Sequence, residues 1–448
     1  MRGSKLMKQQ ILSKQMGYFL IYRLCDWIGK LTGTIILTPH TYAVGNCAEQ
    51  IYHGLLKARR ERKKLVILYP YELPWRLKFR LPNIELINIE SEYRFALNNY
   101  IYMVGRVLIT AYFGFFRALS FLVRLLFRCH LHNLYRTPAI GALTLWQPEE
   151  RLTSFRWDVV DKYDWRKQLQ STFQVSIEKQ KRLIAERRRV GMGLPEEAWF
   201  VCLHVREGGF HNEQKVSERN ADINNYIGAI EEITSRGGWV VRMGDATMTK
   251  LPVMERVIDY PFTEVKSALM DVYLISECRA YVGTASGIFD VAILFQRPII
   301  VTNMTSWLYP FPQKKGDIGL FKHIYSKSRN RFLLVRDWLA EPVEAQHSLL
   351  NFGDDYVFYE NNPEELKTVV KEFFDRGEDW EPTPLQRQFN ELRVCFGRKL
   401  ISEPILSNDD FSDMHQRYRL ASRLDSAVGM VGAEFLQKNW EADARNLS

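Results

Sequence analysis

The chain has 448 residues, of which 46% are hydrophobic, 13% aromatic and 25% charged. This length predicts two domains with a ligand cleft between them, and the composition excludes a disordered, collagen-like or low-complexity protein. A formal net charge of +9 favours anionic partners such as nucleotide phosphates, anionic lipid or nucleic acid.

Residues 1–32 form a basic, amphipathic N-terminal segment. Its apolar run from Met16 to Tyr22 is interrupted by Arg23 and lacks a small-residue cleavage site, so we expect no signal peptide. Six cysteines are widely scattered without a C-x-x-C pair, which predicts neither a disulfide framework nor a zinc site. These features favour a cytoplasmic protein in a reducing compartment.

Residues 33–195 are predicted to form a first, Rossmann-like domain. Three short apolar runs, TIILTPH, KKLVILYP and IELINIE, are typical of strands. Between the first two, a loop with Gly45 and Asn46 precedes an amphipathic helix that ends in a basic cluster, which makes one α/β unit. Gly45 and Asn46 either contact a phosphate or sugar or are an ordinary turn dipeptide. The polar stretch from about 148 to 195 is expected to bridge the two domains.

The most hydrophobic region, residues 100–132, is cut by arginines into pieces too short to span a bilayer. On a helical wheel with about 100° per residue these arginines lie within roughly 40° of one another, opposite a broad apolar face. That pattern suits a helix lying in a membrane interface with its arginines among lipid phosphates, and equally a core helix with a solvated basic stripe. The four residues are Arg106, Arg117, Arg124 and Arg128.

Residues 196–375 repeat a strand and helix alternation. Strands are expected at 199–205, 237–245, 257–260, 280–286 and 298–303, with helices at 222–236, 266–277 and 288–295. This alternation predicts a parallel sheet covered on both faces, whose ligands bind at the carboxyl ends of the strands. A helical tail, residues 376–448, follows.

An anion pocket is predicted where the first strand of this second domain ends. His204 and Arg206 point the same way because side chains alternate along a strand. The arginine fork matches phosphate oxygens, and Gly208 with Gly209 allows the backbone to approach a ligand. The alternative is structural: Arg206 paired with Glu207 or Asp245, and His204 bonded to backbone.

Two further strand ends carry candidate residues. Thr284 and Ser286, with the amides of a helix that begins near Gly287, would form an anion site, unless Ser286 only caps that helix. Carboxylates at strand ends hold a ribose or base in dinucleotide sites, and equally form caps and turns. The carboxylates with these two interpretations are Asp245, in the strand end RMGD that begins with Arg242, and Asp271 at the start of a helix.

These motifs together resemble, in chain order, the glycosyltransferase superfamily that includes the α1,2-, α1,6- and protein O-fucosyltransferases. HVREGG, RNAD at residues 219–222, RMGD and TASG are similar to a group of bacterial glycosyltransferases of uncharacterised specificity. The resemblance covers roughly residues 33–305 and implies a GT-B-like fold with two Rossmann-like domains facing across a cleft.

The resemblance also implies a nucleotide-sugar donor held mainly by the second domain. Arg206 would grip the donor diphosphate together with Thr284, Ser286 and Gly287, while Asp245 and Asp271 would contact the base or ribose. A GDP-sugar is slightly favoured, although Gly287 and Glu207 depart from the fucosyltransferase pattern.

Inverting transfer requires a base for the acceptor hydroxyl and positive charge for the departing diphosphate. Arg206 supplies the charge, and Glu207, Glu213 and His211 are the candidate bases. No D-x-D follows a strand in the first half, so we expect a metal-independent enzyme without a cofactor beyond its donor substrate.

The sequence therefore predicts a glycosyltransferase acting on a lipid-linked or membrane-associated glycan of a bacterial surface polysaccharide, peripherally bound to the inner face of the cell membrane. One alternative keeps the fold: a nucleotide-sugar epimerase or hydrolase. The other is a basic membrane-associated adaptor with a degenerate pocket. No nucleic-acid-binding signature is present in the sequence, so no nucleic-acid partner is expected.

Overall fold

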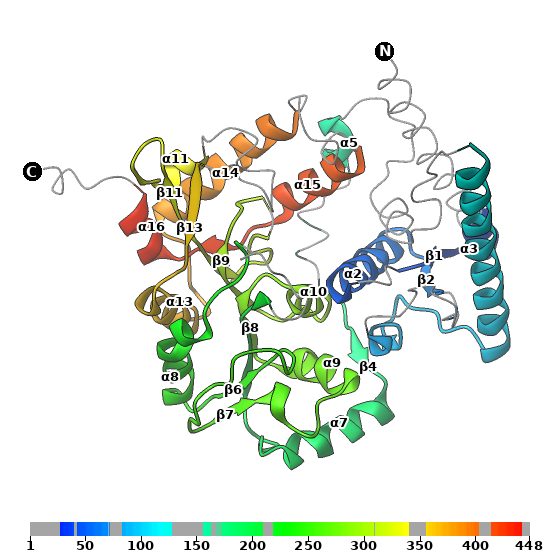
Figure 1. Cartoon of the computed structure of the whole chain (residues 1–448), viewed down its shortest axis with the longest axis horizontal. Helices are drawn as coiled ribbons and strands as arrows, with labels where there is room; N and C mark the ends of the chain where they lie inside the picture. The colour runs from blue at the N-terminus through cyan, green and yellow to red at the C-terminus, as the bar shows by residue number, and fades with distance from the viewer. Residues whose placement is uncertain are drawn as a thin grey trace, which may run out of the picture. The chain divides into compact units, whose positions relative to one another are not determined.

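The computed structural model describes residues 27–39, 43–69, 71, 83–127, 156–162, 167, 170, 172–208, 218–308, 310–339, 355–402 and 414–440. The chain divides into two compact units (Figure 1). Unit 1 comprises Met1–Arg151 and Phe173–Ser176, and unit 2 comprises Leu152–Thr172 and Ile177–Ser448. The main segment of the first unit thus ends at Arg151, inside the bridge expected at 148–195, most of which belongs to the second unit, as does the predicted tail.

Unit 1 is built around a parallel strand pair, β1 (Thr34–Leu37) and β2 (Lys64–Ile67), connected by helix α2 (Val44–Arg60). Gly54 lets the helix approach the pair, since a Cβ there would lie 3.0 Å from the Leu65 side chain. The expected loop at Gly45 and Asn46 is wrong, because helix α2 begins at Val44 and includes both residues in its first turn. Burial of Cys47, Ala48 and Ile51 outweighs the low helix propensity of that turn.

The segment expected to form a third strand, IELINIE at residues 84–90, is extended only at its end. Residues Ile84–Leu86 form a 3-10 helix, η1, capped by the Asn83 side chain, and only Ile89–Glu90 (β3) is extended. The described part of unit 1 therefore shows one strand-helix-strand unit. Strand β4 (Ser176–Ile177) lies where the chain passes into unit 2.

Helix α3 (Asn99–Phe127) is the long helix predicted from residues 100–132. Arg106 contacts residues of unit 1: its Nε donates to the Tyr69 carbonyl at 3.1 Å, and its guanidinium lies 4.1 Å from the Tyr69 ring and 3.8 Å from the Tyr71 ring. Stacking on two tyrosines anchors α3 to the end of β2. Arg128 lies outside the described residues, as do the side chains of Arg117 and Arg124.

Most of the apolar side chains of α3 are exposed. Their exposed fractions reach 72% at Tyr100, 67% at Leu125 and 69% at Leu126. None of the described helices is long and apolar enough to cross a bilayer.

Unit 2 contains a seven-stranded sheet in the order β14-β10-β9-β8-β5-β6-β7, with every pair parallel. The predicted α/β class with a parallel sheet is therefore confirmed. The five predicted strands are β5 (Phe200–His204), β6 (Trp239–Arg242), β7 (Val257–Asp259), β8 (Ala280–Thr284) and β9 (Ile299–Met304).

The chain order of the strands reverses at the middle of this sheet. After β5 the chain adds β6 and β7 on one side, and then returns to add β8, β9 and β10 on the other side. The chain therefore runs in opposite directions from the carboxyl ends of the neighbouring strands β5 and β8. Such a topological switch point is where open α/β sheets bind ligands.

Helices cover both faces of the sheet (Figure 1). After the 3-10 helix η3 (Ile223–Tyr226), helix α8 (Ile227–Ser235) connects β5 to β6 and packs against α13 (Pro363–Asp375). Helix α9 (Ala268–Glu277) lies on the opposite face with α10 (Gly287–Leu294) and α7 (Lys179–Gly191), and follows η4 (Tyr260–Phe262). Right-handed connections in opposite directions from the switch point require this division.

The sequence beyond β9 adds elements that were not predicted. Strand β10 (Ile318–Phe321) continues into a small antiparallel sheet in the order β12-β11-β13, made of Arg331–Phe332, His323–Ser326 and Tyr356–Tyr359. The tail packs back on the core, because β14 (Met430–Val431) pairs with β10. The remaining helices are α5 (Trp157–Lys162), α11 (Val335–Leu339), α14 (Pro384–Ser402), α15 (Met414–Ser426) and α16 (Ala433–Asn439).

Candidate functional site

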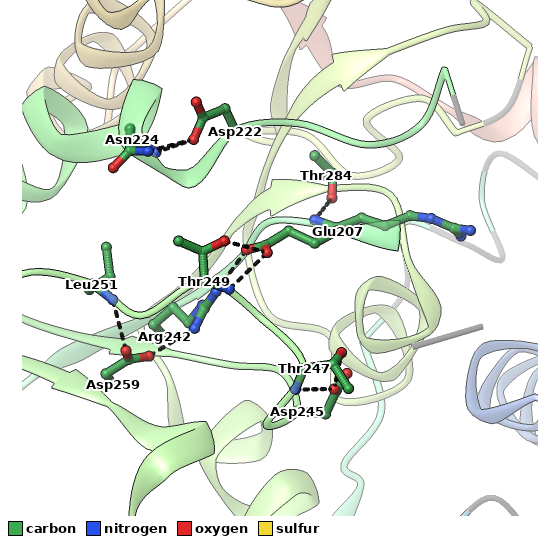
Figure 2. Close-up of polar contacts among 11 residues, drawn as sticks. Glu207, Asp222, Asn224, Arg242, Asp245, Thr247, Thr249, Leu251, Asp259 and Thr284 are labelled. Carbon is green, nitrogen blue, oxygen red and sulfur yellow. Dashed lines mark hydrogen bonds and ion pairs between the residues drawn. The ribbon is translucent and has the colours of Figure 1, made fainter. Parts of the chain in front are cut away.

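The switch point brings the two principal predicted motifs together. The Arg206 backbone N–H donates to Thr284 Oγ1 at 2.8 Å, so the residues that follow β5 and β8 are joined side by side (Figure 2). Gly283 permits this approach. Its φ is +133°, and a Cβ at that position would lie 1.9 Å from the His204 carbonyl oxygen. A side chain at residue 283 would push the two strand ends apart.

Arg206 is partly exposed at this edge, where its charge can reach a ligand. Its Nε donates to Asn220 Oδ1 at 3.2 Å, and its carbonyl accepts from the Ala221 N–H at 3.0 Å. Glu207, one of the two ion-pair partners expected for Arg206 in the structural alternative, pairs with Arg242. Gly208 follows directly, also partly exposed.

His204 is a buried imidazole at the end of β5, with an exposed fraction of 6%. Burial, reinforced by the nearby Arg242 and Arg206 charges, lowers its pKa from 6.5 to about 4, although Asp245 acts in the opposite direction. The ring is therefore neutral near pH 7. Among the groups that the structure describes, its Nδ1 has no hydrogen-bond partner, and a buried polar atom of this kind calls for an acceptor or donor from a ligand or water.

Helix α10 begins at Gly287, directly after the turn at 284–286. Ser286 occupies the cap position with extended backbone, yet its side chain makes no capping hydrogen bond. Simple capping, the alternative weighed for this serine, therefore does not explain it. The first amides of α10 carry the partial positive charge of a helix N-terminus beside Thr284.

Arg242 cross-links neighbouring strand ends from a buried position. Its side chain is fully buried, with Nη1 2.9 Å from Asp259 Oδ1 and Nη2 2.9 Å from Glu207 Oε1 (Figure 2). Glu207 Oε2 accepts from the N–H and hydroxyl of Thr249 at 2.8 and 2.9 Å, and Asp259 Oδ2 accepts from the Leu251 N–H. The guanidinium thereby connects the ends of β5, β6 and β7 to the 247–251 loop. Because it is fully buried, it is not placed to contact a nucleotide-sugar donor.

The two other predicted carboxylates are engaged locally. Asp245 accepts from the N–H and hydroxyl of Thr247, which is a turn interaction. Asp271 lies in the first turn of α9, which is capped by Ser267, and it accepts from the Tyr260 hydroxyl at 2.8 Å and pairs with Lys266. Asp271 therefore belongs near β7, at the edge of the sheet, whereas Asp245 follows β6, next to β5.

The candidate bases are only partly placed. Both carboxylate oxygens of Glu207 are occupied by Arg242 and Thr249. His211 and Glu213 lie outside the described residues and stay predictions, and Gly45 with Asn46 belongs to unit 1. Within the part of the chain that the structure describes, no group of three metal-ligating side chains is found.

The site also contains residues that the sequence argument did not assign. Arg219 and Asn220 contact the residues after β8 and β5 respectively. The only signal for them was the RNAD motif at 219–222, to which no role had been attached.

No protein-family model matches this sequence, and no curated protein does. Solved structures are similar to it, among them two glycosyltransferases. A glycosyl transferase of family 9 from Veillonella parvula DSM 2008 is 11% identical with a TM-score of 0.33, covering 60% of this chain and 80% of that one. The E. coli ADP-heptose LPS heptosyltransferase II is 15% identical with a TM-score of 0.30, covering 60% and 83%.

Proposed function

We propose that the protein is a glycosyltransferase that binds the diphosphate of a nucleotide-sugar donor at the switch point of unit 2. The observation that carries this proposal is the junction of Arg206 with Thr284, beside the N-terminus of α10. A partly exposed arginine follows one of two neighbouring parallel strands there, and a helix begins directly after the other. That arrangement suits a polyanion.

The chemistry follows from the charge that develops during transfer. As the bond from the sugar to the diphosphate breaks, negative charge accumulates on the leaving oxygens, and pre-positioned donors lower the barrier. Arg206 and the amides of α10 supply these donors. His204, neutral at physiological pH, contributes a hydrogen bond and no charge. Transfer with inversion and without a metal remains part of the proposal, as does a GDP-sugar donor.

The first test is thermal stabilisation by GDP, UDP, CMP, dTDP and ADP and their sugar conjugates. A ligand at 100 times its dissociation constant stabilises the native state by about 2.7 kcal/mol, so one nucleotide should raise the melting temperature clearly. The Arg206→Ala variant should lose that shift while its ligand-free melting temperature stays near the wild-type value. If no nucleotide shifts wild type, or the shift survives in Arg206→Ala, the proposed donor site is wrong.

An acceptor assay separates this function from its alternatives. A transferase releases nucleoside diphosphate only when an acceptor glycan is supplied, whereas a hydrolase or epimerase turns the donor over without one. An adaptor with a degenerate pocket would bind none of the nucleotides.

We further propose that the acceptor is membrane-associated and that α3 docks the protein on lipid. Support comes from the exposed apolar side chains of α3 in a protein of net charge +9. Co-sedimentation with anionic liposomes should fall strongly when Leu108, Leu122 and Leu125 are changed to Glu. Matched Glu substitutions at Leu183, Ile184 and Val190, exposed on α7, should leave it unchanged. Equal binding of both triple variants would refute docking through α3.

A further inference from the structure

The segment Arg219–Asp222, here called the strap, crosses the switch point and contacts both of its sides. Arg219 Nη2 donates to the Ala285 carbonyl at 3.1 Å, one residue before the cap position of α10. Asn220 Oδ1 accepts from Arg206 Nε, and the Ala221 N–H donates to the Arg206 carbonyl. The strap therefore contacts the two strand ends that form the proposed anion site.

The strap is itself fixed from the far side. Lys322, which follows β10 and is 5% exposed, donates from Nζ to the Asn220 carbonyl at 2.6 Å. Glu360, which follows β13, accepts from the Asp222 N–H at 2.8 Å, and Asp222 in turn caps η3. Figure 2 shows Asp222 with Asn224 at this cap. A segment held by side chains from two other elements has little freedom to move its own side chains.

The hydrogen bond between Asn220 and Arg206 has a directional consequence. A guanidinium has five N–H donors in one plane, so a hydrogen bond from Nε to Asn220 restricts the direction in which the whole plane of Arg206 can lie. An arginine on a flexible stem loses conformational entropy when it binds a phosphate. Asn220 reduces that cost because it fixes the fork before the ligand arrives.

We infer that the strap is part of the donor site, with Asn220 as a positioning residue for Arg206 and Arg219 as a second guanidinium for the donor diphosphate. The inference rests on the proposed function and names residues of that same site. Arg219 donates to the Ala285 carbonyl, two residues before α10 begins, so its charge lies close to the N-terminus of that helix.

The test is a double-mutant cycle on affinity, with inorganic pyrophosphate and the stabilising nucleotide as probes. Asn220→Ala should weaken both probes by about tenfold, since a hydrogen bond to a charged group is worth roughly that factor. In an Arg206→Ala background the same change should have less than about a twofold effect, because Asn220 acts through Arg206. Arg219→Ala should cost about tenfold in either background, since its contact with the anion is its own.

The matched control is Asn224→Ala, an exposed amide whose side chain donates to Asp222 of the strap, and it should change affinity by less than about twofold. An Asn220 effect of equal size in both backgrounds would mean a general structural role and would overturn the inference. An Arg219→Ala variant with wild-type affinity would also overturn it. If pyrophosphate binds and no nucleotide does, the proposed function fails while the cycle still tests the strap. If neither binds, both proposals fail.

Discussion

Replacement of Arg242 by Met tests whether the edge of the sheet is organised around a buried cation. The guanidinium is inaccessible and pairs with Asp259 and Glu207, both at 2.9 Å. Removing one member of a buried ion pair costs about 3–5 kcal/mol because the remaining charges lose their partners. Here the two carboxylates are 18% and 20% exposed and keep donors from Thr249 and Leu251. We therefore expect the lower end, about 3 kcal/mol.

The assay is urea denaturation of the full chain, with thermal melting as a second measure. A loss of about 3 kcal/mol corresponds to a decrease of about 5 °C in melting temperature for a unit of this size. The matched control is Arg182→Met, since Arg182 also bridges two carboxylates, Glu186 and Glu277, but is 46% exposed. It should cost less than about 1 kcal/mol. Equal losses in the two variants would refute the assignment of Arg242 as a buried cross-link.

Three further predictions concern single residues. His204 is neutral in the folded protein and protonates near pH 6.5 when unfolded, so stability should fall by about 3 kcal/mol as the pH decreases from 6.5 to 4. His204→Gln should lack this loss of stability when urea unfolding is measured across the same pH range. If wild type and variant show the same dependence of unfolding free energy on pH, the prediction is wrong. Gly283→Ala should cost at least about 3 kcal/mol, whereas Gly316→Ala, also at positive φ but with nothing within 4 Å, should cost about 1–2 kcal/mol; equal melting temperatures would contradict the proposed strand contact. Arg106→Gln should destabilise unit 1 by about 2 kcal/mol and leave liposome binding unchanged, as measured by melting and co-sedimentation; reduced lipid binding at unchanged stability would return Arg106 to the lipid-facing role.

Hydrophobic runs between glycines and charged residues were enough to predict the five strands β5 to β9 and the helices that connect them. The runs of β5, β8 and β9 are buried throughout in the parallel sheet, so their apolar pattern is continuous and easily recognised. Strands β12 and β14 are two residues long and carry no such pattern. Their positions depend on partners distant in the sequence, such as the pairing of Val431 with Gly319.

The candidate site was predictable in position but not in its internal contacts. Strand ends and glycines indicated the edge, while the partner of each charged side chain depended on the fold. Arg242 ends its strand as an exposed ligand-binding arginine would, and only the approach of Glu207, 35 residues earlier, and Asp259, 17 later, shows that it is buried. Asn220 was not assigned because its proposed role depends on a hydrogen bond from Arg206, which is 14 residues away in the sequence.

Arg206 and Glu207 are consecutive in the sequence, yet their side chains contact different elements. Arg206 turns to Asn220 and the strap, and Glu207 turns to Arg242 and Thr249 beside β6. A base must have an oxygen available to the acceptor hydroxyl, whereas both Glu207 oxygens already accept hydrogen bonds. Glu207→Gln should therefore lower stability in parallel with Arg242→Met, by about 2–3 kcal/mol, and reduce turnover only as far as folding is lost. Turnover that disappears at wild-type stability would instead restore Glu207 as the base.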